Sequence, residues 1–387
     1  MSPARRRRTS SRPPRSWVPL LAILVLLLGY FLLVQFQRGW IRLPAAEGPT
    51  PAPTEPTSAP GAAGAWYQVY FTTPRYPDKP EYHHGGLDEQ LVAFIGSATG
   101  TLDMAIYDFD LENVANALAQ AAARGVRVRM VTDTDTLTND DPAVQQAFAI
   151  LKQAGIPIVD DQRPAIMHHK FVVADGAAVW TGSWNFTVGD TYRLNNNAIR
   201  IASPELAQNY TAEFEQMFVQ RTFGPRKRAV TPHPALTIAG VPVANYFAPQ
   251  DRVATQIVQH IAQAQRSIHF LAFSFTSDPI AEAMLERARA GVSVAGVFET
   301  TGSETQFSEY GRLRQAGLDV LQDGNPYAMH HKVIIIDERE VIFGSYNFSA
   351  NADRDNDENL LIVADPALAQ AFEAEFQRVR ALALNPP

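Results

Sequence analysis

A motif that occurs twice, 162 residues apart, constrains this chain more than any other feature of its sequence. One H-x-K-x4-D pattern can arise by chance, but here each copy is followed at the same distance by G-S-x-N. Two copies with this shared spacing indicate an internal duplication. The first copy supplies His168, Lys170, Asp175, Ser183 and Asn185, and the second supplies His330, Lys332, Asp337, Ser345 and Asn347.

The duplication extends well beyond the motif. Residues 101–109, for example, match residues 267–275. In each copy a helical segment ends at a glycine, Gly125 or Gly291, and an apolar strand-like run follows. This repeated alternation of helices and strands predicts an α/β layered fold.

A basic cluster and a long apolar segment begin the chain. Residues 17–36 are almost wholly apolar, and a helix of this length spans about 30 Å, one hydrocarbon core. Because arginines precede the segment, we expect residues 1–16 to form a cytoplasmic tail and the body to be translocated. A cleaved signal peptide is the alternative, but the apolar run is long for one and no small-x-small site directly follows it. The sequence thus predicts a single-pass transmembrane anchor in the cell membrane.

The rest of the chain divides by composition and by repeat. Residues 37–64 are rich in Pro, Ala and Thr and predict an extended linker. The first repeat is expected at 65–221 and the second at 243–387. A proline-containing connector at 222–242 joins them.

Charge and cysteine content exclude several classes of function. The chain has no cysteine, which excludes a disulfide framework, zinc–thiolate sites and thiol catalysis. Residues 1–42 hold eight of the 33 basic residues and none of the 40 acidic ones, so the remainder carries 25 basic and 40 acidic residues. An acidic body is a poor generic binder of nucleic acid, because affinity there comes mainly from phosphate neutralisation.

The motif residues suit chemistry on a phosphodiester. His168 and Lys170 are two apart on an expected strand, so they share one face while His169 points away. His330, Lys332 and His331 repeat this arrangement. If the two faces meet, one neutral histidine can attack phosphorus, and the other, protonated, can donate to the leaving alkoxide and then activate water. The lysines would neutralise the phosphate oxygens, with Ser183, Asn185, Ser345 and Asn347 as further donors, and the chemistry needs no metal or other cofactor.

This paired motif strongly resembles the phospholipase D superfamily, over nearly all of residues 65–387. The resemblance implies two α/β sandwich lobes related by a pseudo-twofold axis, in effect a dimer within one monomeric chain, with one site on that axis. It also implies that His168, in the first motif, is the nucleophile and that His330 is the general acid.

The family also places an acid after G-S-x-N, where it orients a motif histidine. Glu358 matches that position in the second repeat, whereas the first repeat has Asn196. An amide raises the basicity of a histidine less than a carboxylate does. The two halves are therefore expected to be chemically unequal, and this departure leaves the competence of His168 open.

Other polar and aromatic residues allow more than one interpretation. Asp175 and Asp337 lie on the opposite strand register from the lysines, so we expect structural roles at the strand end and turn. Asp133 and Glu299 end equivalent strands and could either line the site or cap it. Aromatic residues alternate on the core strands, and one pair of them could wall the cleft: Tyr107, Phe109, Phe273 and Phe275.

Three enzymatic functions share this chemistry. The favoured one is a membrane-anchored phospholipase D-type hydrolase that cleaves phospholipid phosphodiesters or transfers the product to an alcohol. A metal-independent nuclease is the alternative, but it needs a basic groove several phosphates long, and only the run 226–228 and scattered residues such as Arg129 offer one. A cardiolipin synthase-like transferase is less favoured, because those enzymes usually carry more than one N-terminal membrane segment.

Overall fold

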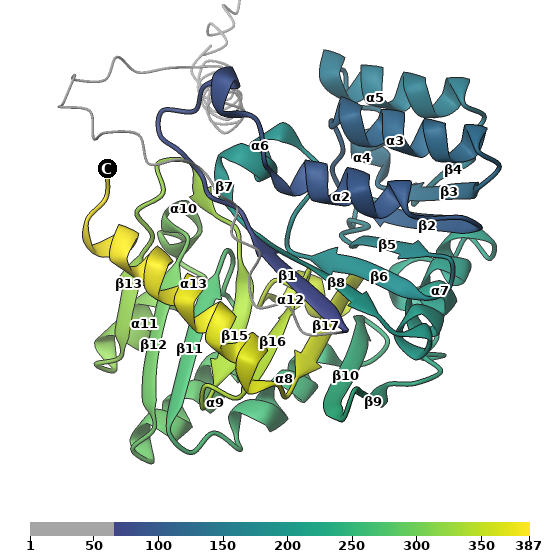
Figure 1. The fold of residues 1–387 in the computed structure, drawn as a ribbon. Coiled ribbons are helices and arrows are strands. Elements are labelled where there is room, and N and C mark those ends of the chain that lie inside the picture. Colours follow the sequence, from purple (N-terminus) through teal and green to yellow (C-terminus); the bar gives the residue numbers. More distant parts are fainter. Residues whose placement is uncertain (1–65) are drawn as a thin grey trace, which may run out of the picture. The chain divides into compact units, whose positions relative to one another are not determined.

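Strands and helices alternate along the chain in the computed structural model, which describes residues 66–387 (Figure 1). The tail, the anchor and the linker expected in residues 1–64 all lie outside the described residues. From Trp66 onward, none of the helices combines the length and hydropathy needed to cross a bilayer. The mixed α/β fold predicted from the sequence is present, and its strands form two large sheets.

The first sheet contains seven strands, with the motif strand β5 at its middle. Its central strand β5 is buried at every residue, which explains why its sequence is a continuous apolar run after Lys170. Strands β2, β3 and β4 are parallel to one another, and the remaining neighbours are antiparallel. In sheet order the strands are β1 (Tyr67–Phe71), β8 (Asn197–Ala202), β6 (Ala178–Gly182), β5 (Lys170–Ala174), β2 (Thr101–Ile106), β3 (Arg127–Thr132) and β4 (Ile158–Asp160).

The second sheet repeats this order and adds one strand at its edge. The added strand, β9, comes from the segment 222–242 that was expected to be a connector. The other strands follow the order of the first sheet, with β10 in the place of β1 and β13 in the place of β4. In sheet order they are β9 (Ala235–Ile238), β10 (Val241–Ala248), β17 (Glu358–Val363), β16 (Glu340–Gly344), β15 (Lys332–Ile336), β11 (Ser267–Ala272), β12 (Ser293–Phe298) and β13 (Asp319–Gln322).

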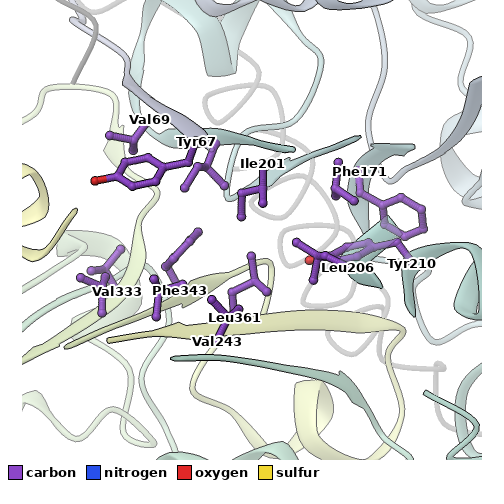
Figure 2. Close-up of a cluster of buried hydrophobic side chains, with 14 of the residues drawn as sticks. Tyr67, Val69, Phe171, Ile201, Leu206, Tyr210, Val243, Val333, Phe343 and Leu361 are labelled. Atoms are coloured by element: carbon purple, nitrogen blue, oxygen red, sulfur yellow. The ribbon is translucent and has the colours of Figure 1, made fainter. Parts of the chain in front are cut away.

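A shared apolar core lies between the two sheets. Tyr67 and Ile201 of the first sheet and Phe343 and Leu361 of the second belong to one buried cluster, as Figure 2 shows. Helix α7 (Pro204–Phe218) packs on the first sheet and reaches β10, and helix α13 (Pro366–Leu384) packs on the second sheet and reaches β1. Both repeats therefore depend on the same core.

The outer face of each sheet is covered by its own helices. On the first sheet these bury a second apolar cluster, and on the second sheet a third. The covering helices are α2 (Leu87–Gly96), α3 (Glu112–Ala123) and α5 (Pro142–Gln153) on one side, and α8 (Val253–Ile261), α9 (Asp278–Arg289) and α11 (Tyr310–Gln315) on the other. The remaining short helices are η1 (Pro80–Tyr82), α4 (Thr134–Leu137), α6 (Val188–Tyr192), η2 (Gly224–Arg226), α10 (Thr300–Ser303) and α12 (Ala350–Arg354).

Glycine ends the helix before β3 and the helix before β12, as the sequence predicted. Gly125 and Gly291 each have φ of 92°, in the region that L side chains rarely adopt. These helices, α3 and α9, begin at Glu112 and Asp278. These two turns lead into β3 and β12, each of which lies next to an edge strand of its sheet.

Candidate active site

The motif histidines precede equivalent central strands. Lys170 is the first residue of β5, and His168 lies two residues before it. Lys332 opens β15 in the same way, two residues after His330. Each lysine Nζ donates to the carbonyl of its own histidine, at 2.8 Å for Lys170 and 2.7 Å for Lys332. All four side chains are buried, and the histidines are only 4% and 6% exposed. The structure thus brings together each His–Lys pair that the sequence singled out.

Each motif histidine is also hydrogen-bonded to the opposite repeat. The backbone N–H of His168 donates to the carbonyl of Asp357 at 3.0 Å, and that of His330 donates to the carbonyl of Asn195 at 2.9 Å. Beside the second contact, β14 (Ala328–Met329) pairs in parallel with β7 (Leu194–Asn195). The segment that carries each histidine is therefore anchored on the other half of the molecule.

The side-chain partners of the histidines cross between the repeats in the same way. Glu358 Oε2 lies 2.8 Å from His168 Nδ1, and Asn196 Oδ1 lies 2.9 Å from His330 Nδ1. The carboxylate of the second repeat thus contacts the histidine of the first, so His168 has a carboxylate partner although its own repeat has Asn196 at that position. Because these contacts engage Nδ1 in both rings, Nε2 is the ring nitrogen that they leave uncommitted.

One pair of aromatic residues lines the histidines, as the sequence allowed. The Tyr107 ring lies 5.1 Å from the His168 ring, and the Phe273 ring lies 4.5 Å from the His330 ring. Lys170 Nζ and Lys332 Nζ lie over these same rings, at 5.1 and 4.6 Å from the centroids. Phe109 and Phe275 instead belong to the outer cores.

Burial and like charge shape the protonation of the site. Burial, together with Lys170 and Lys332, holds the pKa of His168 well below its usual range. Burial and then Lys332 lower the pKa of His330 to about 3. Burial lowers the pKa of Lys170 to about 8, against the favourable charge of Glu358, and burial also holds the pKa of Lys332 well below its ordinary value. Both imidazoles are therefore neutral near pH 7, and an anion beside the lysines would raise both histidine pKa values.

Comparison with known proteins identifies the family. The family described as "Cardiolipin synthase, PLD-like domain" matches two segments, residues 91–218 and 257–380, one around each motif. The chain belongs to this phospholipase D-like family. The predicted superfamily membership is confirmed.

Curated relatives cover one part of this phospholipase D-like chain. A protein named Phospholipase D from Rickettsia prowazekii is 35% identical over 130 residues, which are 34% of this chain and 63% of that protein. A Mitochondrial cardiolipin hydrolase from Chlamydomonas reinhardtii is 33% identical over 125 residues, which are 32% of this chain and 56% of that protein. The chain thus spans less than two thirds of the length of these relatives.

A solved structure extends the likeness in fold over both repeats. The phosphatidylserine synthase of Haemophilus influenzae Rd KW20 aligns with 76% of this chain and 84% of its own, with a TM-score of 0.59. Sequence identity is 15%, so this likeness concerns the fold alone.

The motif serines and asparagines occupy buried positions beside the histidine partners. Ser183 Oγ donates to Asn196 Oδ1 at 2.8 Å, and Ser345 Oγ donates to Glu358 Oε2 at 2.6 Å. Each serine hydroxyl therefore donates its proton to the side chain, Asn196 or Glu358, that contacts a motif histidine. The phosphate-binding role expected for the serines and for Asn185 and Asn347 stays a prediction.

The two motif aspartates lie away from the histidines. Asp175 accepts hydrogen bonds from three successive backbone N–H groups, at residues 99, 100 and 101. Asp337 does the same at residues 265, 266 and 267. Each carboxylate ties the end of the motif strand to the start of the neighbouring strand, the placement that a structural role requires.

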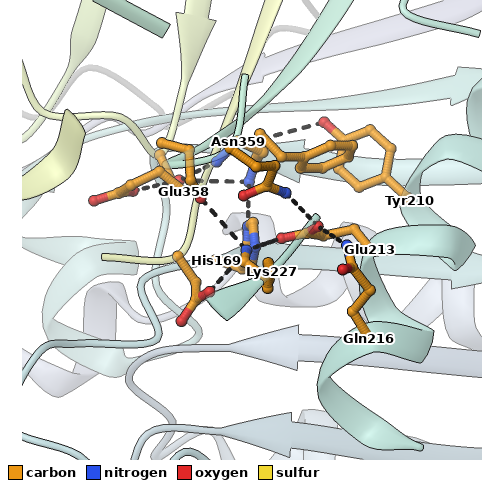
Figure 3. Close-up of polar contacts among 12 residues, drawn as sticks. His169, Tyr210, Glu213, Gln216, Lys227, Glu358 and Asn359 are labelled. Carbon is orange, nitrogen blue, oxygen red and sulfur yellow. Dashed lines mark hydrogen bonds and ion pairs between the residues drawn. The ribbon is translucent and has the colours of Figure 1, made fainter. Parts of the chain in front are cut away.

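The second histidine of each motif points to the opposite side, into the shared core. His169 Nε2 lies 2.9 Å from Glu213 of α7, and His331 Nε2 lies 2.8 Å from Glu375 of α13. Figure 3 shows His169 between Glu213 and Asn359, with Lys227 beside them. Both histidines are fully buried and hydrogen-bonded, as strand alternation predicted.

Several residues that the sequence offered as site or groove candidates form buried ion pairs or helix caps instead. Lys227, from the basic run 226–228, is buried and paired with Glu213 and Asp357. Arg129 is buried against Asp103 at 2.7 Å. Asp133 and Glu299 cap the short helices α4 and α10 through their side chains, which is one of the two interpretations left open. Asp133 also accepts a hydrogen bond from the N–H of Met167, the residue before His168, at 2.9 Å.

One carboxylate at the site escaped the sequence comparison. Asp190, in α6, is buried and its Oδ1 lies 3.3 Å from His330 Nδ1. Its aligned position in the second repeat is Ala352, so comparison of the repeats gave no signal for it. The spacing Thr187-x-x-Asp190, typical of a capped helix start, was the available hint. Within residues 66–387, no cluster of His, Cys, Asp and Glu side chains has the arrangement of metal ligands.

Proposed function

We propose that this chain is a membrane-anchored phosphodiesterase of the phospholipase D type, which hydrolyses phospholipid phosphodiester bonds or transfers the phosphatidyl group to an alcohol. The observation that carries the proposal is the pair of buried motif histidines, each with Nδ1 held by a partner from the opposite repeat and each beside a lysine. Two free Nε2 atoms and two ammonium groups are the set that a two-step displacement at phosphorus requires.

In the first step, His168 Nε2 attacks phosphorus and the bond from phosphorus to the leaving oxygen breaks. Glu358 accepts a hydrogen bond from the Nδ1–H of His168, which fixes the tautomer with a free Nε2 lone pair. The carboxylate also stabilises the positively charged ring that forms after the attack. His330 Nε2 gives its proton to the leaving alkoxide. Lys170 and Lys332 offset the charge of the phosphoryl oxygens.

In the second step, water or an alcohol attacks the phosphohistidine. Neutral His330 takes the proton of the attacking hydroxyl, and the bond between phosphorus and His168 Nε2 breaks. The product is the phosphatidic acid or the exchanged phosphodiester, and both histidines return to their starting states. Burial lowers the pKa of His330 and disfavours its protonated form. The negative charge of the bound substrate phosphodiester raises this pKa, so that His330 can hold a proton near neutral pH.

Charge supports lipid over nucleic acid as the substrate. The chain beyond residue 42 has 25 basic and 40 acidic residues. Two of the cations that might have formed a groove, Lys227 and Arg129, are neutralised by buried acidic partners. The relatives named Phospholipase D and Mitochondrial cardiolipin hydrolase support the same choice.

The test is to assay the purified full chain in EDTA on phospholipid vesicles and on plasmid DNA side by side, with His168→Ala as the control. Head group released by the wild type alone, with intact DNA, is the expected result. Nicked DNA with intact lipid would replace the proposal by the nuclease alternative.

The membrane anchor is a separate part of the proposal and rests on residues 17–36. Because the chain has no cysteine, single cysteines can report its topology in cells. A membrane-impermeant maleimide added outside should label Thr57→Cys and spare Ser2→Cys. Labelling of Ser2→Cys, or of neither, would refute the expected orientation.

A further inference from the structure

The two catalytic histidine candidates have carboxylates at different places in the sequence. His168 has Glu358, which follows G-S-x-N at the family position. At that position the first repeat has Asn196, but Asp190 stands six residues earlier and its counterpart in the second repeat is Ala352. Each repeat therefore supplies one carboxylate to the histidine of the other, from a different element.

Asp190 reaches His330 by two routes. Its Oδ1 lies 3.3 Å from His330 Nδ1. The same oxygen accepts a hydrogen bond from Asn196 Nδ2 at 3.0 Å, and Asn196 Oδ1 faces the same ring nitrogen at 2.9 Å. The amide is thus held between carboxylate and imidazole, so the negative charge of Asp190 acts on the ring directly and through Asn196.

The carboxylate is fixed in this position by its own donors. Asn185 donates to Asp190 Oδ1 through its backbone N–H at 3.1 Å and its side-chain amide at 3.3 Å. Thr187 Oγ1 lies 3.3 Å from Oδ2 and also caps the backbone N–H of Asp190. Although burial disfavours its charge, His330 and these hydrogen bonds lower the pKa of Asp190 below its usual value.

The surrounding charges make this carboxylate necessary to His330. Lys332, on the same segment, and Lys170, on β5, both oppose protonation of the ring. Glu358 contacts His168 instead. Asp110 instead accepts a hydrogen bond from the N–H of Val188, the first residue of α6, at 2.7 Å. Burial raises the pKa of Asp110 to about 7. Asp190, by contrast, brings its Oδ1 to 3.3 Å from His330 Nδ1.

We propose that Asp190 is the positioning residue that makes His330 the proton donor, in place of the acid that the first repeat lacks at Asn196. The proposal rests on the proposed function, since it assigns a direction to proton transfer in that reaction. Removal of Asp190 should therefore weaken the protonation of the leaving group and leave the attack by His168 largely intact.

Two substrates of the purified full chain separate this role from a structural one. A phosphodiester with an alkanol leaving group needs a proton, whereas one with a 4-nitrophenolate leaving group does not. Asp190→Asn, which keeps the shape, and Asp190→Ala should each lose roughly 10- to 100-fold in kcat/KM on the first substrate, part of the general-acid effect, and only a few-fold on the second.

A second-site variant provides the decisive comparison. Asp190→Ala combined with Asn196→Glu rebuilds the arrangement of Ala352 and Glu358, and most of the activity on the alkanol substrate should return. Asp353→Asn is the matched control, because this carboxylate of α12 contacts Tyr346 at 3.0 Å rather than a histidine; any loss there should be equal for both leaving groups.

Equal losses on both substrates in Asp190→Asn and Asp190→Ala, with no recovery in the double variant, would overturn the role of Asp190. Failure of the proposed function looks different. In that case the wild type would cleave neither phospholipid nor the alkanol diester, whatever residue stands at 190.

Discussion

At the scale of single residues, the two motif histidines differ in what holds them. His168 has a carboxylate on Nδ1, whereas His330 has an amide backed by Asp190. A nucleophile gains from a carboxylate that stabilises its positive covalent adduct. This asymmetry agrees with the assignment of His168 as nucleophile that the family resemblance implied.

The assignment predicts which variant traps a covalent intermediate. With bis(4-nitrophenyl) phosphate, whose leaving group needs no acid, His330→Ala should form the phosphoenzyme and fail to hydrolyse it, because no base activates water. His168→Ala should form none. Mass spectrometry of acid-sensitive phosphohistidine reads the result, and an adduct in His168→Ala would reverse the two roles.

A second residue-scale prediction concerns Lys170. Its buried ammonium has a pKa of about 8 and is stabilised by Glu358, so kcat/KM should fall as the pH rises through about 8 and the lysine loses its charge. Glu358→Gln removes the stabilising charge, which lowers the lysine pKa and should shift this alkaline limb to lower pH. Glu299→Gln, at the start of α10, is the control and should show the same alkaline fall of kcat/KM as the wild type. If that fall stayed at the wild-type pH in Glu358→Gln, Lys170 would be excluded as its origin.

The motif residues were predictable from sequence, and their cross-repeat partners were not. Alternation along a strand was enough to place His168 with Lys170 and to turn His169 away. Alignment of the repeats, however, shows that Asn196 and Glu358 are equivalent, not which histidine each contacts. Asp190 was missed because its counterpart is Ala352, and Lys227 was misleading because a basic run in sequence says nothing of burial.

At the scale of elements, each motif strand is joined to its neighbour by an aspartate that accepts three backbone N–H groups. Asp337 has a left-handed backbone, with φ of 54°, which Asp and Asn tolerate better than most residues. Although burial opposes its charge, the backbone donors lower the pKa of Asp337. The resulting stability is present above the unfolded value of 3.8 and is lost as the pH falls through the folded pKa.

Asp337→Asn keeps the backbone conformation and removes the charge. It should lower the free energy of unfolding in urea by about 1 kcal/mol at pH 7, a small loss because the site is near the surface. The difference from wild type should shrink below pH 4. Glu286→Gln, exposed on α9, is the control, and a difference that persists in acid would contradict the charge-based explanation.

Sequence patterns predicted the strands and the helix-ending glycines well, because they are local. They did not predict that the connector supplies β9, which depends on an edge of the second sheet being open to pairing.

At the scale of the whole molecule, the repeats share one apolar core, so we expect them to unfold together. Among the described residues, the tryptophans Trp66, Trp180 and Trp184 all lie in the first repeat. Phe343, fully buried in β16 of the second, should cost about 3–5 kcal/mol when changed to Ala. In a background with Trp17→Phe and Trp40→Phe, this loss should shift the tryptophan fluorescence and the circular dichroism transitions equally.

Phe307→Ala, whose side chain is 71% exposed, is the control for that experiment and should leave both transitions in place. If Phe343→Ala moved only part of the dichroism change and left the fluorescence midpoint unchanged, the two repeats would be separate folding units.

The crossed partners of the two histidines have a consequence for how such a site can diverge. In a pair of identical subunits, any change beside one histidine appears beside the other as well. Joined in one chain, the halves are free to differ, and a substitution at one of these partners changes the direct contact of the opposite half's histidine. Covalent tandem order is thus what permits Glu358 to serve one ring and Asn196 with Asp190 the other, so that attack and proton transfer can be tuned separately.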